Sequence, residues 1–182
     1  MILGDRVRLR RMERSDLPHF VEWLNDPEVR EHLALGFPLG RAHEEQWFEG
    51  TLQQEPAVQP FSLEARTSDP GAEPAEWTLV GNLGFHAVDW RNRSAELGIV
   101  IGRRDHWGRG YGTDATRTLC RWGFEELGLN RIHLRVYEDN ARGIACYERL
   151  GFRLEGRLRQ DRYKHGRYLD TLVMGILRGE LA

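Results

Sequence analysis

The chain has 182 residues, with 26 basic and 28 acidic side chains and a formal net charge of −2. This length suits one domain with a substantial core, and the balanced charge argues against broad nucleic-acid binding by a basic surface. No apolar run approaches the length of a membrane span, and the N-terminus lacks the apolar segment of a secretory signal, so we expect a cytoplasmic protein.

The two cysteines and seven histidines give no sign of a disulfide or a metal site. Cys120 and Cys146 have no paired spacing, and the histidines show no His-x-x-x-His pattern. We therefore expect ordinary thiols, as in a reducing compartment, and no metal ion.

The first third of the chain combines a strand with helices. Residues 7–10 alternate apolar and basic side chains, which is typical of a strand. Ser15 is expected to cap a helix that carries apolar residues at helical spacing and ends near Pro27. Two more helices are expected at residues 28–33 and 42–53.

The rest of the chain alternates strands with two further helices. Residues 67–74 have the composition of an exposed loop, and we expect a long hairpin connection there and a single domain over residues 1–182. Gly128 and Gly151 are expected to stop the two helices. The expected strands are residues 61–65, 77–86, 96–101, 131–137, 152–158 and 168–177, the helices are 113–127 and 140–150, and residues 164–167 are expected to form a hairpin turn.

Three glycines at alternate positions, Gly108, Gly110 and Gly112, lie between an apolar strand and a helix that begins near Thr113. Glycines let a backbone turn tightly and approach a ligand, and the free N–H groups of a helix's first turn bind anions. The dinucleotide fingerprint fails here because Thr113 replaces its third glycine, and the Gly-Lys-Ser/Thr end of a triphosphate loop is absent. We interpret the turn as the binding site for the pyrophosphate of a nucleotide-like cofactor; the alternative is an ordinary surface turn.

A second strand–helix unit follows the same plan. Asn140 follows the strand at residues 131–137 and can cap the next helix. Tyr147 comes about two turns later and therefore lies on the same helix face. The order of elements predicts an α/β fold with a mixed sheet, antiparallel early and parallel across the helix that begins near Thr113. Ligands in such sheets bind beyond the carboxyl ends of parallel strands, where neighbouring connections diverge.

These motifs together resemble the GNAT superfamily of acetyl-CoA-dependent N-acetyltransferases. The resemblance rests on Trp-Gly-Arg-Gly-Tyr-Gly-Thr at residues 107–113 and on Asn140 followed by Tyr147-Glu-Arg-Leu-Gly-Phe152, and it extends over nearly the whole chain. The branch it resembles contains ribosomal-protein N-terminal acetyltransferases and spermidine acetyltransferases. The family often has Gln or Arg where this chain has Trp107, a difference that leaves phosphate binding by backbone amides unaffected.

The resemblance implies a single-domain GNAT fold and acetyl-CoA as co-substrate. The implied architecture is a central mixed, twisted sheet of about seven strands with helices on both faces and a splayed parallel strand pair. Arg103 and Arg104 also flank the glycine turn and are candidates for meeting cofactor phosphates. The residues that the resemblance assigns to cofactor binding are Ile99, Val100, Ile101, Trp107, Gly108, Arg109, Gly110, Tyr111, Gly112, Thr113 and Asn140.

Two side chains are candidates for catalysis. The resemblance assigns Glu96 the role of a general base that takes a proton from the amine, often through water; the alternative is a solvated carboxylate paired with Arg93 or Arg131. Tyr147 matches the tyrosine that protonates the departing thiolate, and a reference pKa of about 10 keeps a phenol protonated at neutral pH. The alternative for Tyr147 is an ordinary core position. Cys146 lacks the His–Asp arrangement of a nucleophile and is expected to pack.

The implied reaction is direct transfer of acetyl to a primary amine in a ternary complex. A catalytically idle acyl-CoA-binding or sensor module, or a protein that acts through a partner, is the alternative. The sequence leaves open whether the acceptor is a polyamine, an aminosugar or a protein N-terminus, and whether the chain is a homodimer. An excess of carboxylates ahead of the middle strands favours a cationic amine; the alternative is that these side chains only face water. The carboxylates are Glu22, Asp26, Glu28, Glu31, Glu44, Glu45 and Glu49.

Overall fold

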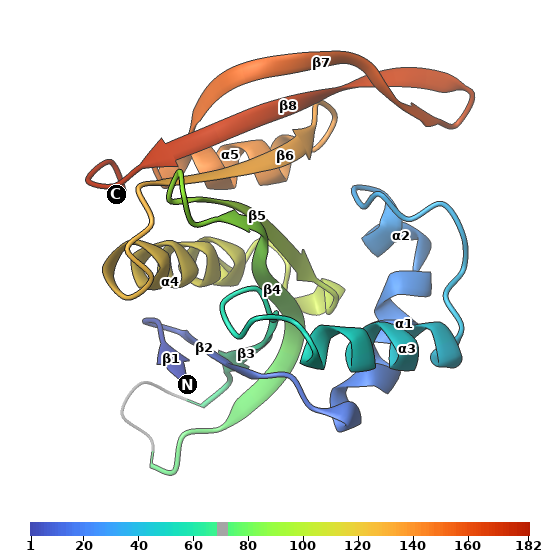
Figure 1. Ribbon diagram of the computed structural model, residues 1–182. Coiled ribbons are helices and arrows are strands. Elements are labelled where there is room, and N and C mark those ends of the chain that lie inside the picture. The colour runs from blue at the N-terminus through green and yellow to red at the C-terminus, as the bar shows by residue number, and fades with distance from the viewer. Residues whose placement is uncertain (69–72) are drawn as a thin grey trace.

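A computed structural model describes residues 1–68 and 73–182, and within these ranges the chain forms one eight-stranded sheet (Figure 1). The strand order is β1-β2-β3-β4-β5-β6-β8-β7, and only β5 and β6 pair in parallel. The sheet has one strand more than the sequence predicted, because the two residues of β1 are too few to show a period. The strands are β1 (Ile2–Leu3), β2 (Val7–Arg11), β3 (Phe61–Arg66), β4 (Trp77–Asp89), β5 (Ser94–Ile101), β6 (Arg131–Tyr137), β7 (Arg153–Lys164) and β8 (Arg167–Leu177).

Helices cover both faces of the sheet, as the sequence predicted. α4 contributes Ala115 and Leu119 to the main apolar core, and α5 packs beside it. α1, α2 and α3 form a second apolar cluster on the other face, where Phe20 and Trp23 lie close to Val100 of β5; Figure 1 shows these three helices at the right, away from α4. The helices are α1 (Leu17–Asn25), α2 (Pro27–Arg30), α3 (Arg41–Leu52), α4 (Tyr111–Glu125) and α5 (Ala141–Arg149), with short 3-10 turns η1 (Arg14–Asp16) and η2 (Arg104–His106). Within the described ranges, no helix has both the length and the apolar character of a membrane span.

Three helix boundaries differ from the prediction. Ser15 does not cap α1, because it lies inside η1 and Asp16 occupies the cap position. The helix expected at residues 28–33 is the single turn α2, after which the Arg30 guanidinium donates to the Leu35 carbonyl at 3.2 Å. α4 begins at Tyr111, earlier than expected, because Gly110 adopts a left-handed conformation with φ +86° and starts the helix at once. The loop expected at residues 67–74 lies partly outside the described residues.

The parallel pair β5 and β6 parts, as the resemblance to the GNAT superfamily implied. Their pairing covers only Ser94–Arg131, Ala95–Ile132 and Glu96–His133. Beyond Glu96, β5 continues to pair with β4 on one side only, up to Ile101 with Gly81. The other edge of β5 therefore opens into the space between the two strands, as does the beginning of α5.

A polar cluster joins the helical layer of α1–α3 to the sheet. Asp16 accepts two hydrogen bonds from Arg10 of β2, both at 2.7 Å, one from Ser62 of β3 at 2.6 Å and one from the Glu13 amide at 2.9 Å. Burial opposes ionisation of Asp16, but the hydrogen bonds from Arg10 and Ser62 outweigh it and hold the pKa of this carboxyl below its ordinary value. This cluster fixes where α1 begins relative to the sheet.

Candidate active site

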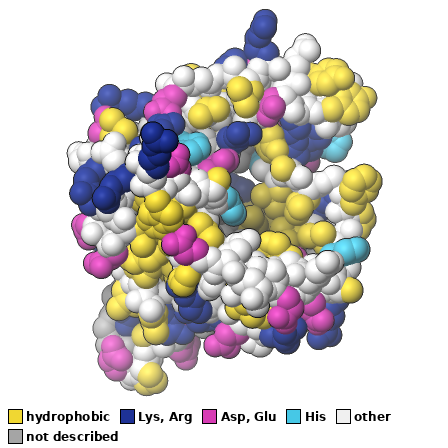
Figure 2. Space-filling view, viewed as in Figure 1, with side chains coloured by type: hydrophobic (Ala, Val, Ile, Leu, Met, Phe, Trp, Pro, Cys, Tyr) yellow, Lys and Arg dark blue, Asp and Glu magenta, His cyan; other side chains and the backbone are white. Residues whose placement is uncertain are grey.

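A cavity of about 1040 Å³ opens where β5 and β6 part, and its walls come from both layers of helices. Figure 2 shows a deep hollow with a largely hydrophobic floor and a histidine at its rim. We name the two walls after the ligands that the sequence resemblance implies for them, and we call the wall built by residues 99–101, Trp107, Gly108, residues 110–113, Asn140 and Tyr147 the coenzyme wall. We call the opposite wall, built by the helical layer, the acceptor wall: Leu24, Val29, residues 32–35, Leu39, His43, Glu44 and Trp47.

The three glycines of the predicted turn line the cavity. Gly108 and Gly110 have positive φ angles of 72° and 86°, which side chains rarely adopt. A Cβ placed on Gly112 would reach no closer than 3.9 Å to Ile101, so the first turn of α4 faces open space. The N–H groups of that turn have no partner inside the helix, and they point at this space together with the positive end of the helix dipole. Such a site suits a pyrophosphate.

The arginine side chains near the turn were expected to meet cofactor phosphates, but they do not line the cavity. The backbone carbonyl of Arg109 accepts a hydrogen bond from Arg6 at 2.7 Å, while its own side chain is exposed and lies outside the cavity lining. Arg103 pairs with Asp105 at 3.1 Å, and Arg104 pairs with Asp26 at 3.2 Å and with Glu28. Among the predicted cofactor residues, Arg109 is the one that does not line the cavity.

Trp107 and Arg142 connect the two strand–helix units of the coenzyme wall. The indole N–H of Trp107 donates to the carbonyl of Ile101 at 2.8 Å, which holds the ring against the end of β5. The Arg142 guanidinium of α5 lies over this ring, 3.9 Å from its centroid. Sequence reasoning missed Arg142, although it follows the Asn140 cap by two residues and its position on α5 could have been inferred.

The second unit is arranged as the sequence predicted. The Asn140 side chain accepts from the Gly143 amide at 2.9 Å and so caps α5. Both Asn140 and Tyr147 line the cavity. Burial raises the pKa of the Tyr147 phenol, so the hydroxyl keeps its proton far above neutral pH. Its ring packs 5.8 Å from that of Phe152.

Cys146 is unsuited to act as a nucleophile. Its sulfur lies 3.2 Å from the Thr113 hydroxyl. Burial raises the pKa of this thiol despite the hydrogen bond, so little thiolate is present at neutral pH. The packing role expected for Cys146 agrees with this environment.

Glu96 lies at the point where the parallel strands part and lines the cavity. Its carboxylate oxygens lie 3.8 Å from His133 Nε2 and 3.6 Å from Arg135 Nε, within ion-pairing range but longer than a direct hydrogen bond. Burial and the nearby Arg131 lower the pKa of His133, which therefore stays neutral beside Glu96 at neutral pH. The pairing considered from sequence is not formed, because Arg131 binds Glu155 at 2.6 Å and Arg93 reaches the Gly128 carbonyl.

His86 is a further side chain of the site that sequence reasoning missed. It sits opposite Glu96 in the β4–β5 register, so both side chains lie on the same face. A Cβ on Gly98 would collide with the His86 imidazole, which shows that the ring crosses Gly98 inside the cavity. Gly98 could have signalled a close contact of this kind, because a glycine inside a strand often marks one.

Most carboxylates expected to attract a cationic amine are already compensated. Glu31 pairs with Lys164 and His165, Glu45 with Arg41, and Glu49 with Arg14. Of the seven carboxylates between residues 22 and 49, Glu44 alone lines the cavity. No group of three or more side chains that could hold a metal ion occurs in residues 1–68 and 73–182.

Comparison with known proteins agrees with this geometry. The sequence profile of the acetyltransferase (GNAT) domain matches residues 6–153. The chain is 30% identical over 180 residues to an uncharacterized N-acetyltransferase, p20, from Bacillus licheniformis, a match that covers 98% of this chain and 96% of the relative. It is 32% identical over 108 residues to a spermidine N(1)-acetyltransferase from Vibrio cholerae, covering 59% of this chain and 62% of that protein.

A solved structure gives the same result for the fold. The crystal structure of spermidine N-acetyltransferase from Vibrio cholerae, in complex with CoA and spermine, superposes with a TM-score of 0.84. The superposition covers 97% of this chain and 98% of that chain at 24% sequence identity.

Proposed function

The chain belongs to the GNAT acetyltransferase family, and from this premise we propose that it moves the acetyl group of acetyl-CoA directly to a primary amine held between Glu96 and Tyr147. The observation that carries the proposal is the position of these two side chains. Both line one cavity at the opening between β5 and β6, next to the glycine turn.

Glu96 prepares the amine for attack. An alkylammonium group has a reference pKa of about 10.4 and is mostly protonated at neutral pH, whereas only the neutral amine is a nucleophile. Glu96 accepts the proton, directly or through a water, because neither His133 nor Arg135 is close enough to form a direct hydrogen bond with its carboxylate. The neutral imidazole of His133 leaves the Glu96 charge available for this task.

The open edge of β5 stabilises the developing charge. Residues 99–101 have no partner strand on the side of β6, so backbone N–H groups on that edge can bind the pantetheine arm and donate to the thioester oxygen. Donors fixed in advance at the place where negative charge grows are a large source of rate acceleration.

Tyr147 protonates the leaving thiolate. Its buried phenol has a raised pKa and therefore carries its proton throughout the neutral range. The proton passes to the sulfur as the carbon–sulfur bond breaks, and the new carbon–nitrogen bond is formed by the attacking amine. Cys146 takes no part as an acyl carrier, because burial suppresses its thiolate.

A panel of amines tests the proposal. Purified protein is incubated with acetyl-CoA and with polyamines, aminosugars or peptides with a free N-terminus, and release of CoA is followed together with the mass of the acetylated product. We expect stoichiometric CoA and acetylated primary amine with at least one class of cationic acceptor. Tight binding of acetyl-CoA without turnover on any amine would instead favour a catalytically idle coenzyme-binding module.

A further inference from the structure

Glu44 is a buried carboxylate in the acceptor wall. It lies in the first turn of α3, on the same face as the buried Phe48 and Thr51 at the i+4 and i+7 positions. Only 4% of its surface is exposed, yet it lines the cavity. The helix therefore directs an acidic group inward at a position where an apolar side chain is the usual choice.

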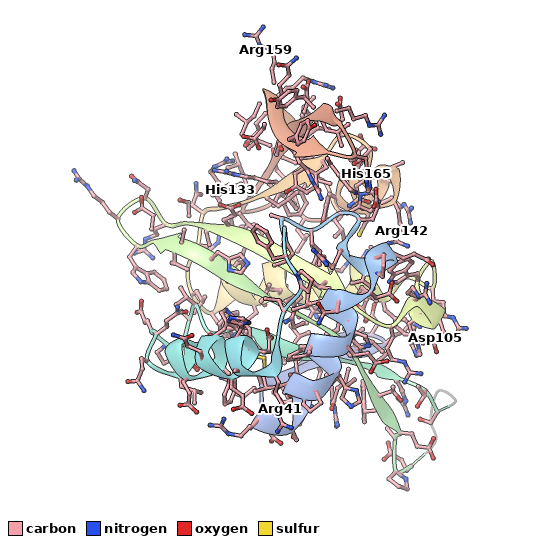
Figure 3. The ribbon with its side chains drawn as sticks, turned by 90° about the vertical axis from the view of Figure 1, so that its right-hand side faces the viewer. Arg41, Asp105, His133, Arg142, Arg159 and His165 are labelled. Carbon is pink, nitrogen blue, oxygen red and sulfur yellow. The ribbon has the colours of Figure 1, made fainter. Side chains whose placement is uncertain are left out.

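The charge of Glu44 has no partner among the residues that the structure describes. Among residues 1–68 and 73–182, no cationic group lies within ion-pairing distance of it, and its carboxylate accepts no hydrogen bond. Glu45, the next residue along the helix, contrasts with it, because it pairs with Arg41 at 3.1 Å. Figure 3 shows Arg41 at the outer, lower edge of the helical layer. Burial of the unpaired carboxyl raises the pKa of Glu44, and a cation that entered the cavity would relieve this cost.

Trp47 adds a second element suited to a cation. It follows Glu44 by three residues, so the two side chains are neighbours on one helix face. Trp47 lines the cavity and is 40% exposed, so its indole is accessible to a ligand. The face of an indole attracts ammonium groups.

We propose that Glu44 and Trp47 form a subsite for a second positive charge on the acceptor, so that the preferred substrate is a primary amine carrying another ammonium group at a distance from the reacting one. The inference rests on the proposed function: the reacting nitrogen lies at Glu96, and the second charge lies at Glu44, on the acceptor wall of the same cavity.

The experiment compares two acceptors of equal carbon number, n-butylamine and 1,4-diaminobutane, with wild-type protein, Glu44→Gln and Trp47→Leu. Glu45→Gln is the matched control, since it removes a carboxylate from the adjacent position on the outer side of α3. We expect Glu44→Gln to lower kcat/KM for the diamine by about tenfold, through KM, with the monoamine changed by less than about twofold. Trp47→Leu should act in the same direction with a smaller effect, and Glu45→Gln should change neither acceptor.

Ionic strength provides a second readout. In the wild-type protein kcat/KM for the diamine should fall as salt rises, because screening weakens the attraction to Glu44, and Glu44→Gln should flatten this response. Thermal unfolding tests a purely structural role: a carboxylate that only stabilises the first turn of α3 would make Glu44→Gln less stable, whereas removal of an unpaired buried charge should leave the melting temperature equal or higher.

The outcomes separate the subsite from the proposed function. If wild-type protein acetylates both amines equally well, or if Glu44→Gln lowers both to the same extent, the subsite is wrong while the acetyltransferase assignment stands. If wild-type protein acetylates neither these amines nor any other member of the panel, the proposed function fails as well.

Discussion

The two walls of the cavity are held in different ways. The coenzyme wall rests on the main apolar core, in which the α4 residues Ala115, Leu119 and Phe124 are at most 5% exposed. The acceptor wall rests on a small apolar cluster and on ionic contacts, among them the hydrogen bonds between Asp16 and Arg10. Under the proposed function, the wall with the larger apolar support would hold the coenzyme, and the wall with more polar support would hold the acceptor.

The β7–β8 hairpin also contacts the acceptor wall, and it does so through polar and charged groups. Arg162 donates to the carbonyl of Leu33 at 2.9 Å, and Lys164 contacts the Glu31 carboxylate and carbonyl. The hydrogen bond from Lys164 lowers the pKa of Glu31 to about 2, so this contact remains charged over the whole neutral range. The hairpin thus holds the acceptor wall from above, while its bend near Gln160 leaves Arg159 pointing into solvent (Figure 3).

The largest effect is expected on the coenzyme wall, from Tyr147→Phe. Loss of the hydroxyl removes the proton donor to the thiolate, and kcat should fall by about 100-fold with affinity for acetyl-CoA unchanged. Because burial raises the pKa of Tyr147, wild-type activity should show no loss from tyrosine ionisation up to about pH 10. Steady-state kinetics with calorimetry measures both quantities.

Tyr163→Phe is the control, since Tyr163 is 66% exposed on the hairpin and lies outside the cavity lining. A kcat for Tyr147→Phe within about twofold of wild type would assign the proton transfer to water or to another group.

Glu96 lies between the two walls, and Glu96→Gln should act most strongly at neutral pH. There the rate should drop by about 100-fold, and the loss should shrink towards pH 10, where the amine loses its proton without help. Glu155→Gln, which removes a carboxylate outside the cavity lining, should leave the pH–rate profile unchanged. A Glu96→Gln profile that is only scaled down, with no recovery at high pH, would contradict the role of base.

The hydrogen-bonded cluster around Asp16 supports the acceptor wall, and we expect its loss to lower the stability of the protein. Asp16→Asn should lower the free energy of unfolding by about 2 kcal/mol at neutral pH, because charge-assisted hydrogen bonds to Arg10 are lost. The folded-state pKa of Asp16 is depressed, so its contribution is present above the unfolded value of about 3.9 and is lost as the pH falls below it. The difference between variant and wild type should therefore narrow towards pH 3 in denaturant titrations.

Glu49→Gln is the control for Asp16→Asn. It breaks only the exposed ion pair between Glu49 and Arg14 in the helical layer, and exposed pairs contribute little to stability. Equal destabilisation by the two variants would remove the special role of Asp16.

The smallest expected effect is a loss of acetyl-CoA affinity caused by a substitution in the glycine turn. Gly112→Asp should weaken acetyl-CoA binding by about tenfold, or about 1.4 kcal/mol, since it places a negative charge where we expect the pyrophosphate to bind. Gly112→Ala fits the available space, with its Cβ 3.9 Å from Ile101, and should bind almost as well as wild type. Unchanged affinity of the Asp variant in calorimetry would move the phosphate site elsewhere.

The contrast between the two walls also explains which parts of the site could be predicted from the sequence. The backbone conformation of the coenzyme wall could be predicted, because the glycines of the turn and the Asn140 cap leave local signals that need no knowledge of distant contacts. The parting of β5 and β6 was implied by the resemblance to the GNAT superfamily.

The acceptor wall could not be predicted in the same way. Asp16, and not Ser15, anchors α1, because its partners come from β2 and β3, far away in the chain. Glu44 and Glu45 look alike in sequence, and only the spacing of Glu44 from Phe48 and Thr51 marks it as inward-facing. The ion pairs that compensate Glu28 and Glu31 join residues more than 70 positions apart.

The central claim is direct transfer between ligands bound together at the two walls, and an initial-velocity study tests it most directly. Acetyl-CoA and the best amine of the panel are varied together, with the acetylated product identified by mass. Direct attack in a ternary complex predicts double-reciprocal lines that intersect. Parallel lines, with an acetyl group recovered on the protein at Cys146 or elsewhere, would mean a covalent acyl-enzyme and would contradict the account.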